Sequence, residues 1–186
     1  LMIAPLCCFF MIGKTYLQVK NIPFKQAVMM GLAEDGGLLL PESIPQLTPG
    51  DLDALAKLAY PELAFQVMSY FIEDIPSADL KSLIDRSYSS FTHRDITPLI
   101  HRDGLYILEL FHGPTLAFKD FALQLLGRLL DYVLERRHRK VVIMGATSGD
   151  TGSAVFVVIV VPAMQLANPV TSSQPKWPDA PTGRPR

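Results

Sequence analysis

The sequence has few of the features that mark metal, disulfide or nucleic-acid proteins. Its two cysteines, Cys7 and Cys8, are adjacent, so they provide neither zinc-site spacing nor a disulfide framework. The 17 Lys and Arg residues nearly balance the 18 Asp and Glu residues, and the net charge of −1 leaves no basic surface for nucleic acid. Hydrophobic residues make up 49% of the 186, as in ordinary globular proteins. We therefore expect a globular protein with no metal and no nucleic-acid partner.

Long hydrophobic runs are also missing. Residues 1–12 form an apolar run that is too short to span a membrane, and no basic residue precedes it as a signal peptide requires. We expect residues 1–21 to be an apolar leader outside the folded part, and the protein to be cytoplasmic with no membrane partner. Residues 162–186 hold six of the 15 prolines, which predicts a flexible tail.

Residues 22–96 have the pattern of a small, mostly helical domain. A helix over 24–32 is expected to end at the turn Asp35–Gly37, followed by a short strand over 38–40. Further helices are expected to begin at Thr48-Pro49, at Pro61 and at Ser77, which would act as a cap. The residues expected to share the inner faces of these three helices are Leu52, Leu55, Ala56 and Ala59; Leu63, Val67 and Tyr70 or Phe71; and Leu80, Leu83, Ile84 and Tyr88.

Residues 97–161 have a different texture. A strand over 105–110 and a loop over 111–118 precede a helix that Asp120 is expected to cap. A buried strand over 141–144 then leads into a glycine-rich loop, 145–152. The order strand, helix, strand, glycine loop predicts the start of an α/β doubly wound domain. The apolar stripe expected on the helix consists of Ala122, Leu125, Leu126, Leu129 and Val133. The basic residues of its last turn complement the helix dipole.

The glycine-rich loop GATSGDTG (145–152) is a candidate binding site. It is not a P-loop, because no Lys-Ser/Thr follows its last glycine, and it is not GxGxxG. Its glycines let the backbone approach a ligand, and Thr147, Ser148 and Thr151 supply hydroxyl groups. A helix beginning near Thr151 would offer free amides to a carboxylate or phosphate. An ordinary strand-to-helix turn explains the same glycines, and both interpretations stay open.

Lys119 is the candidate reactive group. It ends the apolar stretch Leu116–Phe118 and immediately precedes the expected helix. Apolar burial and the positive end of a helix both disfavour an ammonium ion, which favours the nucleophilic amine that a Schiff-base lysine requires. A surface lysine whose stem lies along apolar side chains is the alternative.

These two motifs together resemble a known family. HGPTLAFKDFA (112–122) followed by VIMGATSGDTGSA (142–154) is similar to threonine synthase, a family of pyridoxal-phosphate enzymes of fold type II. GLAEDGGLLLPE (31–42) resembles the N-terminal domain of that family, and Thr97-Pro98-Leu99 its domain junction. The resemblance covers about residues 22–155. It implies the small-molecule substrate O-phosphohomoserine, which is converted with water to threonine and phosphate.

The resemblance also implies roles for individual residues. Lys119 matches the catalytic lysine to which pyridoxal 5'-phosphate is attached, and Asp150 matches a second residue at the cofactor. Related fold type II enzymes often have Asn in place of Asp150, whereas Asp is usual in this branch. The residues that match the substrate-binding loop are Thr147, Ser148, Gly149, Asp150 and Thr151.

The resemblance ends after Val155, and that limits the expected activity. In the family, two further features are expected later in the sequence: the distal loop that binds the cofactor phosphate, and the partner of the pyridine nitrogen. Residues 156–186 match neither. We therefore expect the start of a truncated fold type II α/β domain after a helical N-terminal domain, inactive by itself. Residues 156–161 (FVVIVV) add an uncharged, aggregation-prone window. A related phospholyase and a non-catalytic remnant that binds an anion or a partner stay as alternatives, and the oligomeric state stays open.

Overall fold

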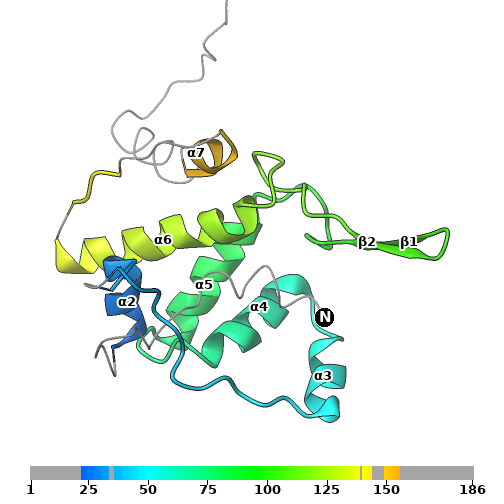
Figure 1. Cartoon of the computed structure of the whole chain (residues 1–186), viewed down its shortest axis with the longest axis horizontal. Coiled ribbons are helices and arrows are strands. Elements are labelled where there is room, and N and C mark those ends of the chain that lie inside the picture. Colours follow the sequence, from blue (N-terminus) through cyan, green and yellow to red (C-terminus); the bar gives the residue numbers. More distant parts are fainter. Residues whose placement is uncertain (1–21, 34–35, 139, 144–148, 156–186) are drawn as a thin grey trace, which may run out of the picture.

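The structure is a computed structural model that describes residues 22–33, 36–138, 140–143 and 149–155. Within these ranges the chain forms helices and one short hairpin (Figure 1). The elements are α2 (Phe24–Met30), α3 (Pro49–Leu55), α4 (Tyr60–Ser69), α5 (Ser77–Tyr88), β1 (Leu99–Arg102), β2 (Leu105–Leu108), α6 (Asp120–Arg137) and α7 (Asp150–Val155). The expected leader over 1–21, the apolar window over 156–161 and the tail over 162–186 lie outside the described residues.

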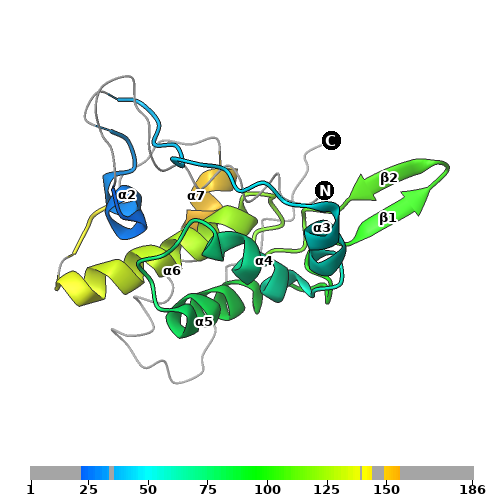
Figure 2. The ribbon, with the colours of Figure 1, turned by 90° about the horizontal axis from the view of Figure 1, so that it is seen from below.

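The core lies where α4, α5 and α6 pack together. In Figures 1 and 2, α6 runs across α5, α4 lies beside α5, α2 rests on the C-terminal half of α6, and α7 lies near its N-terminal end. Helical spacing places the apolar side chains of each helix on one face. All four residues predicted for the inner face of α5 are buried: Leu80, Leu83, Ile84 and Tyr88. Among the described helices, none has both the length and the apolar character needed to cross a membrane.

The stripe predicted for α6 is correct at its centre and incomplete at its edges. Leu125, Leu129 and Val133 are buried, whereas Ala122 and Leu126 are half-buried. The buried face continues to Phe121 and Tyr132, which periodicity places one turn from the predicted residues. Long helices with a clear 3.6-residue period are therefore well predicted here.

Three details of the helical domain differ from the expectation. None of the residues of α3 is buried, and α3 ends at Leu55, so the predicted inner face of that helix is wrong. Tyr70 is 45% exposed, and Phe71 is the one that packs against the core. Pro76 takes the N-cap position of α5, so Ser77 is the first helical residue rather than the cap. By contrast, the start of α3 at Thr48 is confirmed, because Thr48 forms a capping box with Asp51.

Two predicted strands do not form. Residues 38–40 form no strand and have no partner strand among the described residues, and only Leu39 of the three is buried, against Ala27 and Ala33. Residues 141–143 are exposed, with Val142 at 87%, so the described part of the predicted strand 141–144 is neither buried nor paired. A strand requires a hydrogen-bonding neighbour, and the described residues provide none for either segment.

The strand predicted over 105–110 forms in part, as β2, which ends at Leu108. Its partner β1 was missed. The two strands pair antiparallel, with Leu99 opposite Leu108 and Arg102 opposite Leu105. Asp103 and Gly104 turn the chain with φ values of 50° and 78°, and the Asp-Gly pair is a known signal for such a hairpin. Figures 1 and 2 both show the hairpin extending away from the helices.

Candidate functional site

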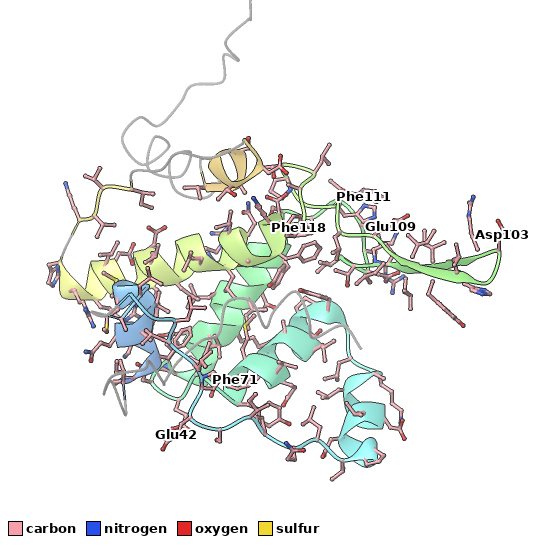
Figure 3. All side chains as sticks on the ribbon, viewed as in Figure 1. Glu42, Phe71, Asp103, Glu109, Phe111 and Phe118 are labelled. Carbon is pink, nitrogen blue, oxygen red and sulfur yellow. The ribbon has the colours of Figure 1, made fainter. Side chains whose placement is uncertain are left out.

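The loop that leads to Lys119 is tied to the helical domain at its start. The His112 carbonyl accepts hydrogen bonds from the Thr92 backbone amide at 2.9 Å and from its hydroxyl at 3.2 Å. The His112 ring forms a 2.6 Å contact with the Glu109 carboxylate, and it lies against the ring of His93. Figure 3 shows Glu109 and Phe111 between the hairpin and the N-terminal end of α6. These contacts fix the direction in which the loop approaches α6.

A tight turn then carries the chain from Gly113 to Lys119. The Leu116 amide donates to the Gly113 carbonyl at 3.1 Å, and Leu116 has a φ of 60°, which is uncommon for a bulky residue. Gly113 is buried, and a Cβ there would stand 2.5 Å from the Asp120 Cβ. The turn therefore packs directly onto the first residue of α6.

Asp120 does not cap α6 as the sequence predicted. Lys119 takes the N-cap position with helical dihedral angles, and Asp120 is the first helical residue. Its carboxylate instead reaches back to Thr115: the Thr115 amide donates to Oδ2 at 2.8 Å and the Thr115 hydroxyl to Oδ1 at 2.9 Å. Asp120 is 0% exposed. The sequence missed this pairing, because an acidic residue before a helix is normally interpreted as a cap.

Lys119 lies between this turn and α7. Its side chain is half-buried, and its Nζ is 5.9 Å from the centre of the Phe118 ring. The Nζ donates a hydrogen bond to Thr151 Oγ1 at 2.5 Å, although the two residues are 32 positions apart in the chain. The amine is therefore aimed at the start of α7 rather than at open solvent.

The glycine-rich loop is described from Gly149 onward, and Thr147 and Ser148 lie outside the described residues. Gly149 has a φ of 123°, a conformation that only glycine adopts readily. Its carbonyl accepts from the Ser153 amide at 2.8 Å. α7 begins at Asp150, one residue before the start that the sequence predicted, and Asp150 is exposed. Among the described residues predicted to bind substrate, Thr151 contacts Lys119.

This arrangement offers an amine, a hydroxyl group and a helix start within one small region. Figure 3 shows Phe111 and Phe118 at the N-terminal end of α6, far from Phe71 and Glu42 on the other side of the helices. Phe118 and Leu116 are exposed, at 59% and 70%. In the part of the chain that the structure describes, no group of His, Cys, Asp or Glu side chains could hold a metal ion. The chemistry available here is that of an amine beside a hydroxyl group.

Comparisons with known proteins agree with the motifs. Residues 14–88 match the family model described as threonine synthase N terminus. The threonine synthase of Pseudomonas aeruginosa is 52% identical over 141 residues, which cover 75% of this chain and 30% of that protein. The chain therefore spans about 30% of the length of this relative.

Solved structures show the same relation in three dimensions. The yeast threonine synthase matches with a TM-score of 0.71 and 46% identity, over 76% of this chain and 31% of that one. The PLP-bound threonine synthase from Brucella melitensis matches with a TM-score of 0.70 and 45% identity, over 74% of this chain and 30% of that one. The fold class predicted from the sequence is confirmed: mixed helices and a small sheet match the N-terminal region of a fold type II enzyme.

Proposed function

Since the chain carries the N-terminal region of the threonine synthase family, we propose that it forms the lysine-bearing part of a pyridoxal-phosphate enzyme. The proposed reaction converts O-phosphohomoserine and water to threonine and phosphate. The observation that carries the proposal is the hydrogen bond from Lys119 Nζ to Thr151 Oγ1, which joins the two motifs of the family. The relatives named above are threonine synthases, so they do not favour the phospholyase alternative.

The described residues fit the cofactor on the side of its carbonyl group. Lys119 presents one half-buried amine at a fixed place, as covalent attachment requires. When bound, pyridoxal phosphate supplies an electron sink for bonds to the α-carbon of an amino acid. Lys119 is the residue to hold the cofactor, and Asp150, exposed at the start of α7, is the second contact.

The roles of the other residues follow from their chemistry. With the cofactor and substrate bound, the Lys119 amine would take up and return protons at Nζ. Thr151 would hold this amine in place through the hydrogen bond that the structure shows. The backbone amides and hydroxyl groups of the loop are suited to the substrate carboxylate. The residues in that group are Thr147, Ser148, Gly149, Asp150 and Thr151.

Borohydride trapping tests the assignment of Lys119. A chimaera in which residues 22–155 replace the matching segment of the P. aeruginosa threonine synthase is incubated with pyridoxal phosphate, reduced, digested and mapped by mass spectrometry. We expect a pyridoxyl group on Lys119, and its loss in Lys119→Ala but not in Lys57→Ala, where an exposed lysine is removed. A label spread over surface lysines, with none enriched at Lys119, would refute the cofactor role and support a non-catalytic remnant.

The same chimaera tests the reaction itself, and its products from O-phosphohomoserine are analysed. Threonine and phosphate are expected, whereas a keto acid with ammonia would indicate a phospholyase. Gly149→Val should lower turnover at least about tenfold, because the φ of 123° excludes a β-branched residue and the loop must admit substrate. Normal turnover in that variant would count against the role of the loop.

A further inference from the structure

Asp120 has no part in the proposed chemistry, yet it is fully buried beside the reactive lysine. Burying a carboxylate is unfavourable unless its oxygens are satisfied. Thr115 satisfies both oxygens of Asp120: the Thr115 amide donates to Oδ2 at 2.8 Å and the Thr115 hydroxyl donates to Oδ1 at 2.9 Å. A structural carboxylate could have capped its own helix. This one holds the loop in front of the helix instead.

The Thr115–Asp120 pair closes a short loop around Lys119. The loop contains the left-handed residue Leu116, and it is tied again by the Asp120 amide, which donates to the Ala117 carbonyl at 3.0 Å. Lys119 lies directly before Asp120, so the backbone of Lys119 is held on both sides. Gly113 fits under the same side chain, where no Cβ has room. A shift of the Lys119 backbone would therefore break the hydrogen bonds to Asp120.

We propose that Asp120 is a positioning residue for Lys119. The Thr115–Asp120 clasp fixes the start of α6, and this directs the Lys119 amine to Thr151 at the start of α7. The proposal rests on the proposed function of Lys119 and adds a reason for the acidic residue that follows it. Asp120 acts through its contact with Thr115 and touches neither cofactor nor substrate in this role.

Three substitutions separate the parts of the clasp. Asp120→Ala removes both hydrogen bonds, and Thr115→Val removes only the one from the hydroxyl group. Asp120→Asn keeps the shape: its carbonyl oxygen accepts from the Thr115 amide, and its NH₂ group donates to the Thr115 hydroxyl. The clasp needs geometry rather than charge, so Asp120→Asn should rescue what Asp120→Ala loses. Thr151→Val removes the hydroxyl group to which the Lys119 amine donates, and it leaves the clasp intact.

Competitive acetylation measures how firmly the amine is held. The 186-residue chain is treated with a trace of acetic anhydride, and the labelling of Lys119 is divided by that of the exposed Lys57 in the same molecule. The ratio should be below one in the unchanged chain, because the Lys119 amine is half-buried and engaged. We expect it to rise about fivefold in Asp120→Ala and about twofold in Thr115→Val, and to stay unchanged in Asp120→Asn. Thr151→Val should raise it as well.

A merely structural role makes a different prediction. It would lower the melting temperature of Asp120→Ala and Thr115→Val without moving the labelling ratio of either folded variant, and that result would overturn the proposal. If Asp120→Ala does not fold, Thr115→Val decides: a raised ratio supports the clasp and an unchanged one overturns it. The cofactor is not needed for this measurement. Absence of the pyridoxyl label on Lys119 would refute the proposed function alone, whereas normal trapping with unchanged acetylation ratios would refute the positioning role alone.

Discussion

Gly113 is a residue where backbone space is severely restricted. It is buried under Asp120, and an added Cβ would stand 2.5 Å from the Asp120 Cβ. Real Cβ atoms do not approach one another so closely, and Asp120 cannot move away without losing its hydrogen bonds to Thr115. The glycine in the loop is thus required by packing rather than by a positive φ.

Gly113→Ala is therefore expected to destabilise the fold by about 1–3 kcal/mol. The free energy of unfolding is measured by urea titration. Gly50→Ala provides the control, because a Cβ there would meet only Thr48 Oγ1, at 3.7 Å, and the glycine lies in helix α3. Alanine in a helix should be neutral or stabilising at this position. Equal stability of the Gly113→Ala variant would show that the loop can shift.

Two buried tyrosines make the protein sensitive to alkali. Tyr60 and Tyr88 meet edge to face, with their ring centres 4.8 Å apart, and the Tyr88 hydroxyl donates to the Phe121 carbonyl at 3.1 Å. Burial raises the pKa of Tyr60 to about 12, and it raises that of Tyr88 as well. An unfolded tyrosine has a pKa near about 10. The protein therefore holds these protons more tightly when folded than when unfolded.

The sign of the pH dependence follows. The contribution of Tyr60 to stability is complete below about pH 10 and is lost as the pH rises through about 12. Over this window the free energy of unfolding should fall by about 2 kcal/mol for Tyr60 alone. Urea titrations at intervals from pH 8 to 12 measure the slope, which Tyr60→Phe should reduce. Val133→Ala removes buried apolar surface far along α6 from Phe121, whose ring packs against Tyr60, so it should lower stability equally at every pH. A slope that Tyr60→Phe does not alter would contradict the assignment.

At the scale of elements, the pairing of α5 with α6 is secured at its outer end by Asp79. In the first turn of α5, Asp79 accepts from the Tyr132 hydroxyl at 2.7 Å and from Arg136 at 3.1 Å. The Arg136 guanidinium lies 3.4 Å from the centre of the Tyr132 ring. One carboxylate thus joins the start of α5 to the last turns of α6.

Asp79→Ala should lower the free energy of unfolding by about 1 kcal/mol, mostly through the Tyr132 hydrogen bond. Arg136→Met should cost less, because both members of that ion pair are substantially exposed. Asp85→Ala is the matched control: Asp85 also lies in α5, and its carboxylate pairs with the exposed Lys81, at 3.5 Å. The three variants are compared by urea unfolding. A cost for Asp85→Ala as large as that for Asp79→Ala would argue against a specific link.

The elements differ in how well the sequence predicts them. α5 and α6 follow from periodicity, because each buries one face against a neighbour that is nearby in the chain. The segments 38–40 and 141–143 also look like strands, but strand formation depends on a partner that the segment itself does not encode. The hairpin is the opposite case. Its signal, the Asp103-Gly104 pair, is present in the sequence, although β1 was not predicted from it, and the structure places a hairpin turn at this pair.

Only part of the candidate site, likewise, can be predicted from the sequence. Lys119 and the glycine loop are recognisable from their motifs, and the structure brings Lys119 to Thr151. The clasp between Thr115 and Asp120 is not recognisable, since a threonine five residues before an acidic residue is no standard spacing. Whether Asp120 caps its helix or accepts hydrogen bonds from Thr115 depends on the turn between these two residues. That turn includes the left-handed Leu116, which no residue preference predicts.

At the scale of the whole molecule, apolar side chains are divided between a core and an exposed arm. The core lies among α4, α5 and α6, while the hairpin projects from them (Figures 1 and 2). Residues from both faces of the hairpin are exposed: Leu105 and Ile107 on one, Leu99 and Tyr106 on the other. Apolar side chains on two faces of a thin hairpin cannot bury one another. With a net charge of only −1, little repulsion keeps two such chains apart.

Self-association through the hairpin is the expected consequence. Replacing Leu105 and Ile107 by Thr removes one apolar face, and replacing Leu99 and Tyr106 by Thr removes the other. Threonine keeps the strand preference, so the hairpin should still form. We expect either pair of substitutions to raise the soluble concentration several-fold and to lower light scattering, with both pairs together giving the largest effect. Leu52→Thr is the control, because Leu52 is likewise exposed, at 48%, but lies on α3 rather than on the hairpin. If Leu52→Thr improves solubility as much as the hairpin variants do, association is a matter of general hydrophobicity and the hairpin has no special part in it.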